Sequence, residues 1–278
     1  MKKQPLINLS DSGVMPQIGL GVWRADNQQA RDATLEAFRT GYRSVDTASV
    51  YNNERGVGQA LRLARDLHGL SRDQYFVTTK LWNDCHGYDD ALKSCEESLA
   101  RLGLDWVDLY LIQWPAPGRD RYVEAWKALL RLKKDGRVRA VGVSNFLPHH
   151  LDRLMDETGE RPAVNQIELH PHFQQNDLCE ATKRRGVKVE AWAPLGCGAA
   201  LSDPLFIKLA QKHLKTPAQV VLRWHLDLGR IAIPKSVRPT RIKENFGVFD
   251  FRLDAEDLRQ IALLDRGRRL GPNPATFS

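Results

Sequence analysis

The sequence predicts an α/β protein built as a single (β/α)8 TIM barrel. Short apolar runs rich in Val and Ile alternate with longer segments of helical period, which is typical of parallel β/α units. About eight such units in a chain of 278 residues fit a closed barrel. No linker, composition shift or internal repeat divides the chain, so residues 1–278 are expected to form one domain.

The strand and helix candidates alternate along the whole chain. The expected strands are residues 17–22, 43–48, 75–81, 107–113, 138–144, 163–169, 188–195 and 231–237. Apolar side chains between them recur at helical spacing, as in Ala30, Ala33, Ala37 and Phe38, in Leu92, Cys95, Leu99 and Leu102, and in Tyr122, Trp126, Leu129 and Leu130. Glycines at 41, 103 and 136 are expected to end three helices, and Thr216 before Pro217 predicts the start of another.

Polar residues are expected at the carboxyl ends of successive strands, where barrel active sites lie. Asp46 ends the second expected strand, Lys80 the third, Gln113 the fourth, and Ser144 and Asn145 the fifth, while Gln166 lies in the sixth. The competing fold, an open doubly wound sheet, usually carries a glycine-rich turn after its first strand. GVGQAL at 56–61 is a weak match, because it has only two of the three glycines and follows no strand.

Composition excludes several function classes. The net charge is +7, but the basic residues are scattered among acids, which suits an anionic cofactor better than nucleic acid. Residues 1–10 lack the apolar core of a signal peptide, and no stretch approaches the roughly 18 apolar residues of a membrane span, so a cytoplasmic protein is expected. The widely spaced Cys85, Cys95, Cys179 and Cys197 are interpreted as free thiols.

Asp46, Tyr51 and Lys80 form a constellation that can donate a proton. A tyrosine with a pKa near ~10 rarely gives up its proton at neutral pH, but a neighbouring ammonium lowers that pKa. Lys80 can supply the ammonium, and Asp46 can keep it charged and oriented. The three groups together therefore predict an acid for a carbonyl oxygen. A lysine that forms a Schiff base, as in a barrel aldolase, is the alternative interpretation of Lys80.

Motifs along nearly the whole chain resemble those of the aldo-keto reductase superfamily, particularly its bacterial 2,5-diketo-D-gluconate and methylglyoxal reductases. They are, in order, MPQIGLGVW, YRSVDTASVYNNE, TTKLWND, DLYLIQWP, VGVSNF, AVNQIELHP, IPKSVRPTRIKEN and RRLGPNP. The resemblance implies that NADPH delivers hydride to a small carbonyl substrate and that Tyr51 donates the proton. It also implies a monomer that uses no metal, although His170 and His172 invite a metal interpretation.

The same resemblance assigns cofactor-binding positions. Ser144, Asn145 and Gln166 fall where relatives hold the nicotinamide carboxamide, Trp192 where they stack a ring on nicotinamide, and Leu195 near the pyrophosphate. The segment IPKSVRPTRIKEN resembles the adenosine-phosphate site, since a helix start attracts phosphate. Its residues are expected to contact the 2′-phosphate (Lys235, Ser236, Arg241) and the adenine (Glu244, Asn245).

Gln113 departs from the family, which commonly has histidine at this place. A glutamine amide can donate a hydrogen bond to the carbonyl oxygen but cannot titrate. The alternatives are a side chain that pairs with strand backbone, a protein that binds NADPH and turns over slowly, or reduction of a carbon–carbon double bond. Trp23, Trp82 and Trp114 are expected to wall a pocket for a small polar substrate. The tail after Arg269 is short, and the resemblance therefore implies small substrates, because relatives that act on bulky substrates tend to carry longer C-terminal loops.

Overall fold

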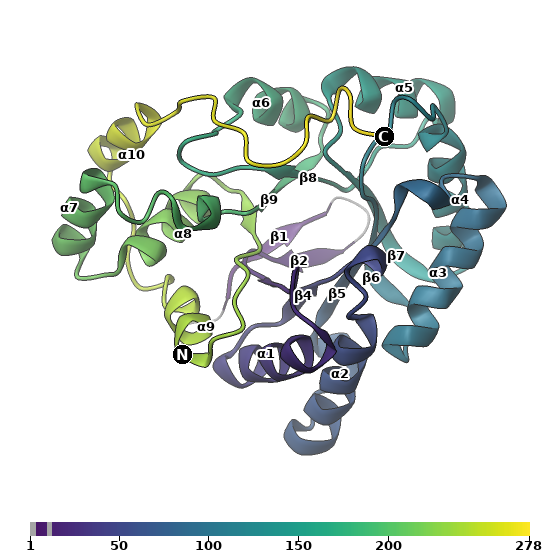
Figure 1. Cartoon of the computed structure of the whole chain (residues 1–278), viewed down its shortest axis with the longest axis horizontal. Helices are drawn as coiled ribbons and strands as arrows, with labels where there is room; N and C mark the ends of the chain where they lie inside the picture. Colours follow the sequence, from purple (N-terminus) through teal and green to yellow (C-terminus); the bar gives the residue numbers. More distant parts are fainter. Residues whose placement is uncertain (1–3, 10–12) are drawn as a thin grey trace.

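A computed structural model describes residues 4–9 and 13–278, and eight parallel strands form its central sheet in the order β3 to β10 (Figure 1). Parallel bridges from Ile18 to Ala232 and from Gly21 to Lys235 join the first of these strands to the last, so the sheet closes into the predicted barrel. The strands are β3 (Leu20–Gly21), β4 (Ser44–Asp46), β5 (Phe76–Leu81), β6 (Val107–Ile112), β7 (Val138–Ser144), β8 (Val164–Glu168), β9 (Lys188–Trp192) and β10 (Ile231–Ala232).

Helices surround these strands (Figure 1). They are α1 (Asn27–Thr40), α2 (Glu54–His68), α3 (Tyr88–Leu102), α4 (Tyr122–Lys134), α5 (Pro148–Thr158), α6 (Asn176–Arg184), α7 (Pro204–His213), α8 (Pro217–Asp227), α9 (Pro239–Phe246) and α10 (Ala255–Ala262). Helices α7 and α10 were not predicted from the sequence. Both begin after an aspartate whose side chain accepts a backbone hydrogen bond, Asp203 and Asp254.

The predicted helix ends are confirmed. Gly41 and Gly103 follow α1 and α3 with φ of 121° and 68°, a region that L side chains rarely adopt. Gly136 follows the α4 cap with φ of 75°. The Thr216 hydroxyl accepts a hydrogen bond from the backbone of Gln219, and Pro217 begins α8.

A short antiparallel hairpin closes the amino end of the barrel. Its strands are β1 (Leu6–Asn8) and β2 (Val14–Pro16), and neither was predicted from the sequence. Leu9 and Met15 are buried in one apolar cluster with Phe76 and Val164, the first residues of β5 and β8. The opposite end, where the strands finish, is therefore the open mouth of the barrel.

The inference drawn from residues 1–10 falls partly on positions 1–3 and 10, which lie outside the described residues. Within the described part of the chain, no helix combines the length and the apolar character that crossing a bilayer requires. The four cysteines are free.

Candidate active site at the barrel mouth

The predicted polar residues meet at the carboxyl ends of neighbouring strands. Asp46 and Ser144 are the last residues of β4 and β7, Lys80 is the last but one of β5, and Gln113 directly follows β6. Trp192 ends β9. Because the strands are parallel, these side chains share one end of the barrel.

Asp46 and Lys80 form a buried ion pair. The Lys80 Nζ lies 2.5 Å from Asp46 Oδ1 and also donates to the Thr47 carbonyl oxygen at 2.9 Å. Burial alone lowers the pKa of Lys80, but Asp46 and Tyr51 outweigh it and raise that pKa above its ordinary value. Lys80 therefore stays charged at neutral pH, which disfavours the Schiff-base alternative, since that chemistry needs a free amine.

Tyr51 lies beside this pair, at the end of a short 3₁₀ helix, Ser49–Tyr51. The Lys80 Nζ is 5.1 Å from the centroid of the Tyr51 ring. Burial raises the pKa of Tyr51, the Lys80 ammonium lowers it and Asp46 raises it, and the net direction is upward. The expected sign of the Lys80 effect is correct, but burial is the larger effect. The hydroxyl is thus protonated at neutral pH and available as a donor.

Hydrogen bonds fix the loop that carries Tyr51. Asn53 is fully buried and its amide nitrogen donates to the carbonyl oxygens of Val22 and Ala25, each at 2.9 Å. The Thr47 hydroxyl donates to Asn53 Oδ1 at 2.7 Å, and Ser49 Oγ donates to the Lys80 carbonyl oxygen at 3.0 Å. These contacts set the position of the phenol relative to β4 and β5.

A second network holds Asn145 and Trp192. Asn145 has φ of 65°, a left-handed conformation that asparagine tolerates better than most residues. Its Nδ2 donates to the Gln113 carbonyl oxygen and to Ser144 Oγ, each at 3.0 Å, and its Oδ1 accepts from Trp192 Nε1 at 2.8 Å. The indole of Trp192 is therefore fixed in orientation while its ring remains partly exposed.

The side-chain oxygen of Gln113 is buried and accepts no hydrogen bond within the described residues. The alternative in which this atom pairs with strand backbone is thus not seen. The Gln113 backbone, by contrast, donates to the Leu81 carbonyl oxygen at 3.0 Å. The unused atom is an acceptor, so it can orient a donor group of a bound polar ligand.

Gln166 is joined to a carboxyl that the sequence analysis did not single out. Gln166 Nε2 donates to Asp46 Oδ2 at 2.9 Å and to Glu190 Oε2 at 2.8 Å. Glu190 is fully buried, and burial together with the nearby Asp46 charge raises its pKa to about 8. The signal in the sequence was an acid two residues before Trp192, on the same face of an apolar strand.

The C-terminal tail, the yellow segment in Figure 1, runs along the β8 side of the barrel mouth. Glu168 accepts hydrogen bonds from the backbone nitrogens of Leu270 at 2.6 Å and Gly271 at 2.9 Å. The Phe277 ring then lies 4.8 Å from that of Trp114 and 6.3 Å from that of Trp82. The tail therefore narrows the mouth between two of the three predicted tryptophans.

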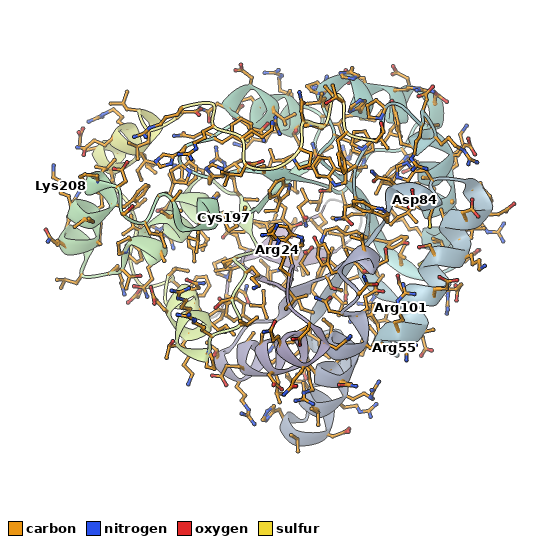
Figure 2. All side chains as sticks on the ribbon, in the orientation of Figure 1. Arg24, Arg55, Asp84, Arg101, Cys197 and Lys208 are labelled. Atoms are coloured by element: carbon orange, nitrogen blue, oxygen red, sulfur yellow. The ribbon has the colours of Figure 1, made fainter. Side chains whose placement is uncertain are left out.

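Trp23 differs from the other two tryptophans. It is 46% exposed, and the Arg24 guanidinium lies 4.2 Å from its ring centroid, near the middle of the view in Figure 2. Its ring contact is thus with Arg24 and not with Phe277.

The expected adenosine-phosphate residues surround the start of α9. Lys235 and Arg241 are exposed and make no ion pair with any described residue. The α9 N-cap, Arg238, provides no side-chain hydrogen bond, and the first residue of the helix, Pro239, has no N–H. The backbone N–H groups that follow Pro239 therefore remain available. Free cations beside a helix start suit a phosphate group.

The remaining members of that set have internal contacts. The buried Ser236 Oγ accepts from the Arg238 backbone nitrogen at 3.1 Å, and Glu244 Oε1 accepts from Thr216 Oγ1 at 2.6 Å. Asn245 is buried on α9. Leu195 lies on the loop after β9, immediately before a 3₁₀ turn at Gly196–Gly198.

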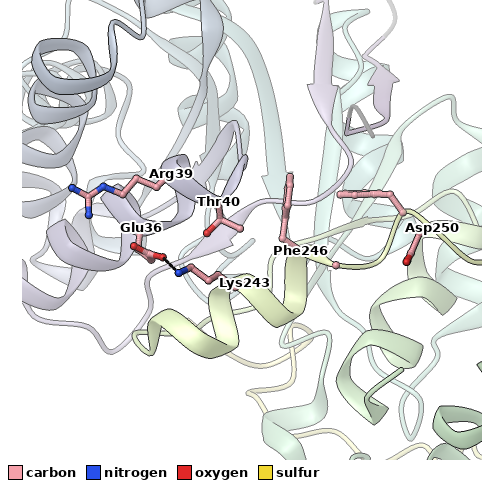
Figure 3. A pocket seen from close by; sticks show the side chains of 8 residues that line it. Glu36, Arg39, Thr40, Lys243, Phe246 and Asp250 are labelled. Carbon is pink, nitrogen blue, oxygen red and sulfur yellow. Dashed lines mark ion pairs between the residues drawn. The ribbon is translucent and has the colours of Figure 1, made fainter. Parts of the chain in front are cut away.

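A pocket with a volume of about 740 Å³ lies between α1 and α9 (Figure 3). No predicted site residue lines it, although α9 also carries Arg241, Glu244 and Asn245. Phe246, Lys243 and Glu36 are among the residues that line it, and Lys243 forms an ion pair with Glu36 at 3.2 Å. This pocket shares none of the chemistry described above.

His170 and His172 make carboxylate contacts. His170 Nε2 is 3.1 Å from Glu168 Oε1, and His172 Nε2 is 3.6 Å from Asp203 Oδ2. Over the stretches 4–9 and 13–278, no cluster of three or more His, Cys, Asp or Glu side chains could hold a metal ion.

The chain is similar over its whole length to proteins of a known family. Residues 17–266 match the model of the aldo/keto reductase family. The chain is 50% identical to methylglyoxal reductase DkgA of Salmonella typhimurium, covering 100% of this chain and 99% of that protein. A mutant of Gox0644 in complex with NADPH is 50% identical with a TM-score of 0.94 and full coverage of both chains. An aldo-keto reductase of Bombyx mori in complex with NADP is 35% identical with a TM-score of 0.92, covering 97% and 95%. The chain therefore belongs to the aldo/keto reductase family.

Proposed function

We propose that this enzyme reduces small aldehydes, dicarbonyls or keto sugars, of the methylglyoxal or 2,5-diketo-D-gluconate type, with Tyr51 as the proton donor. The main support for this proposal is the buried Asp46–Lys80 ion pair, which lies beside a protonated Tyr51 at the barrel mouth. The enzyme is an NADPH-dependent oxidoreductase. We further propose that residues 1–278 form one domain, which acts as a monomer in the cytoplasm.

Bound NADPH supplies the hydride that reduces the carbonyl carbon. The Tyr51 hydroxyl donates its proton to the carbonyl oxygen, and Lys80 stabilises the phenolate that remains because its ammonium is held charged by Asp46. The Gln113 amide orients the same oxygen by donating a hydrogen bond. Trp82, Trp114 and Phe277 exclude water and limit substrate size, which favours small carbonyl compounds.

The residues present fit the cofactor. Trp192, held by Asn145, offers a fixed and partly exposed ring for the nicotinamide, with Ser144, Asn145 and Gln166 beside it for the carboxamide. Leu195 would lie at the pyrophosphate. Lys235, Ser236 and Arg241 at the start of α9 would bind the 2′-phosphate, with Glu244 and Asn245 near the adenine. An extra phosphate is what these unpaired cations would recognise, so NADPH is favoured over NADH.

Replacing Arg241 tests the phosphate site. We expect Arg241→Ala to weaken NADPH binding roughly 10- to 100-fold, the effect of losing a charged hydrogen bond, with NADH binding unchanged. The matched control is Lys243→Ala on the same helix, because Lys243 is directed to Glu36 and not to the helix start (Figure 3). Calorimetry measures the dissociation constants of NADPH and NADH for each variant. An equal loss of affinity for both cofactors would contradict a contact with the 2′-phosphate.

Replacing Gln113 tests its role at the carbonyl oxygen. We expect Gln113→His to raise kcat/KM for methylglyoxal by up to about tenfold, because an imidazole that can gain charge makes a stronger hydrogen bond to developing negative charge. Steady-state rates with NADPH measure the change. Unchanged or lower activity of the variant would show that the site is adapted to glutamine. A different result concerns the unmodified enzyme: if it binds NADPH tightly but reduces little carbonyl substrate, carbon–carbon double-bond reduction or a binding role is favoured.

A further inference from the structure

Glu190 is a buried carboxyl to which the proposed reaction assigns no task. It is the third residue of β9 and pairs in register with Gln166 of β8. Its side chain is fully buried, and Oε1 has no hydrogen-bond partner in the described part of the chain. Burial of a carboxyl is costly, so a residue of this kind needs a compensating role.

The contact that Glu190 does make is with the amide of Gln166. Gln166 Nε2 has two N–H groups, and it donates to Asp46 Oδ2 at 2.9 Å and to Glu190 Oε2 at 2.8 Å. Two carboxyl groups that both accept from the amide nitrogen fix the amide against rotation by 180°. The Gln166 side-chain oxygen consequently becomes the one polar atom of that amide still free to accept a hydrogen bond.

The register of the neighbouring strands places the Gln166 side chain beside the residues proposed to bind the cofactor. Ser144 of β7 is the register partner of Gln166 on the other side, and Ser144 Oγ donates to the Gln166 carbonyl oxygen at 2.8 Å. Asn145, which follows Ser144, accepts a hydrogen bond from Trp192. The fixed oxygen of Gln166 can therefore accept a hydrogen bond from the N–H group of a primary amide bound beside these residues.

We propose that Glu190 is a positioning residue that orients the Gln166 amide, so that Gln166 Oε1 accepts a hydrogen bond from the nicotinamide carboxamide. This inference rests on the proposed function, because it requires the nicotinamide to bind at this end of the barrel. Asp46 alone leaves one amide N–H without an acceptor, and Glu190 supplies it.

The charge balance of the site is consistent with this role. Asp46 from β4 and Lys80 from β5 neutralise one another, and both act electrostatically on Glu190. Burial raises the Glu190 pKa to about 8, so near neutral pH the carboxyl carries a proton and its other oxygen still accepts from Gln166. Glu190 thus orients the amide without adding a second negative charge beside Asp46.

The test compares NADPH with its 3-acetylpyridine analogue, which carries an acetyl group in place of the carboxamide and so lacks the N–H donor. Calorimetry of the purified full chain gives both dissociation constants. We expect the unmodified protein to favour NADPH, and Glu190→Leu to lose about three- to tenfold in NADPH affinity with little change for the analogue. Glu190→Gln keeps an acceptor at this place and is expected to retain the discrimination.

Gln166→Leu completes a double-mutant cycle. It should lose as much NADPH affinity as Glu190→Leu does. The double variant should lose no more affinity than either single variant, since both substitutions act through the same hydrogen bond. Additive losses, or a Glu190→Leu protein that still discriminates, would overturn the inference. If leucine prevents folding, Glu190→Gln decides, because loss of discrimination in that variant contradicts the proposal. Failure of the unmodified protein to bind NADPH would instead overturn the proposed function.

Discussion

Tyr51→Phe is expected to reduce kcat for carbonyl reduction by about 10²- to 10⁴-fold, the usual contribution of a positioned general acid. The variant removes the hydroxyl and keeps the ring, so the contact with Lys80 and the packing of the Ser49–Tyr51 turn are retained. NADPH affinity should stay unchanged, because no cofactor contact is assigned to this hydroxyl. Single-turnover measurement of NADPH oxidation with methylglyoxal separates the chemical step from product release.

Two controls make this result specific. Tyr88→Phe removes a phenol hydroxyl from an exposed position at the start of α3 and should leave kcat unchanged. Thermal unfolding should show that both variants fold. A Tyr51→Phe enzyme with full activity would refute the assignment of the proton donor.

Lys80→Met is expected to lower the free energy of unfolding by about 3–5 kcal/mol, because it leaves the Asp46 carboxylate buried without its partner. It also removes the donor to the Thr47 carbonyl oxygen. Activity should fall as well, since the phenolate of Tyr51 loses the ammonium that stabilises it. Urea denaturation monitored by circular dichroism gives the stability change.

The double variant Asp46→Asn/Lys80→Met separates stability from chemistry. It removes both charges, so most of the lost stability should return, as when a buried ion pair is replaced by neutral groups. The activity should not return, because Tyr51 still lacks a neighbouring cation. Recovery of activity in the double variant would show that Lys80 serves only the fold.

The barrel could be predicted because its strands are local features of the sequence. Each expected strand overlaps an observed one, and residues at strand ends such as Asp46, Lys80 and Gln113 reach the same mouth as a consequence of parallel topology. The turn chemistry of Thr216 and Pro217 was equally local. The family motifs added the identity of the cofactor, which no spacing rule supplies.

Features that depend on contacts between distant residues could not be predicted. Phe277 meets Trp82 and Trp114 because the tail, bound by Glu168 among other residues, returns to the mouth, and no local sequence pattern predicts such a contact. The link between Gln166 and Glu190 needs the register of two strands. The upward pKa shift of Tyr51 depends on how deeply the folded chain buries the phenol, which a sequence does not state.

The most direct test of this account is the rate of NADPH oxidation by the unmodified enzyme with methylglyoxal and, separately, 2,5-diketo-D-gluconate. We expect oxidation that depends on the carbonyl compound, that yields one alcohol for each NADPH consumed, and that is much slower with NADH. Tight NADPH binding without carbonyl-dependent oxidation would contradict it and would show that the arrangement of Asp46, Tyr51, Lys80 and Gln113 does not reduce carbonyl groups.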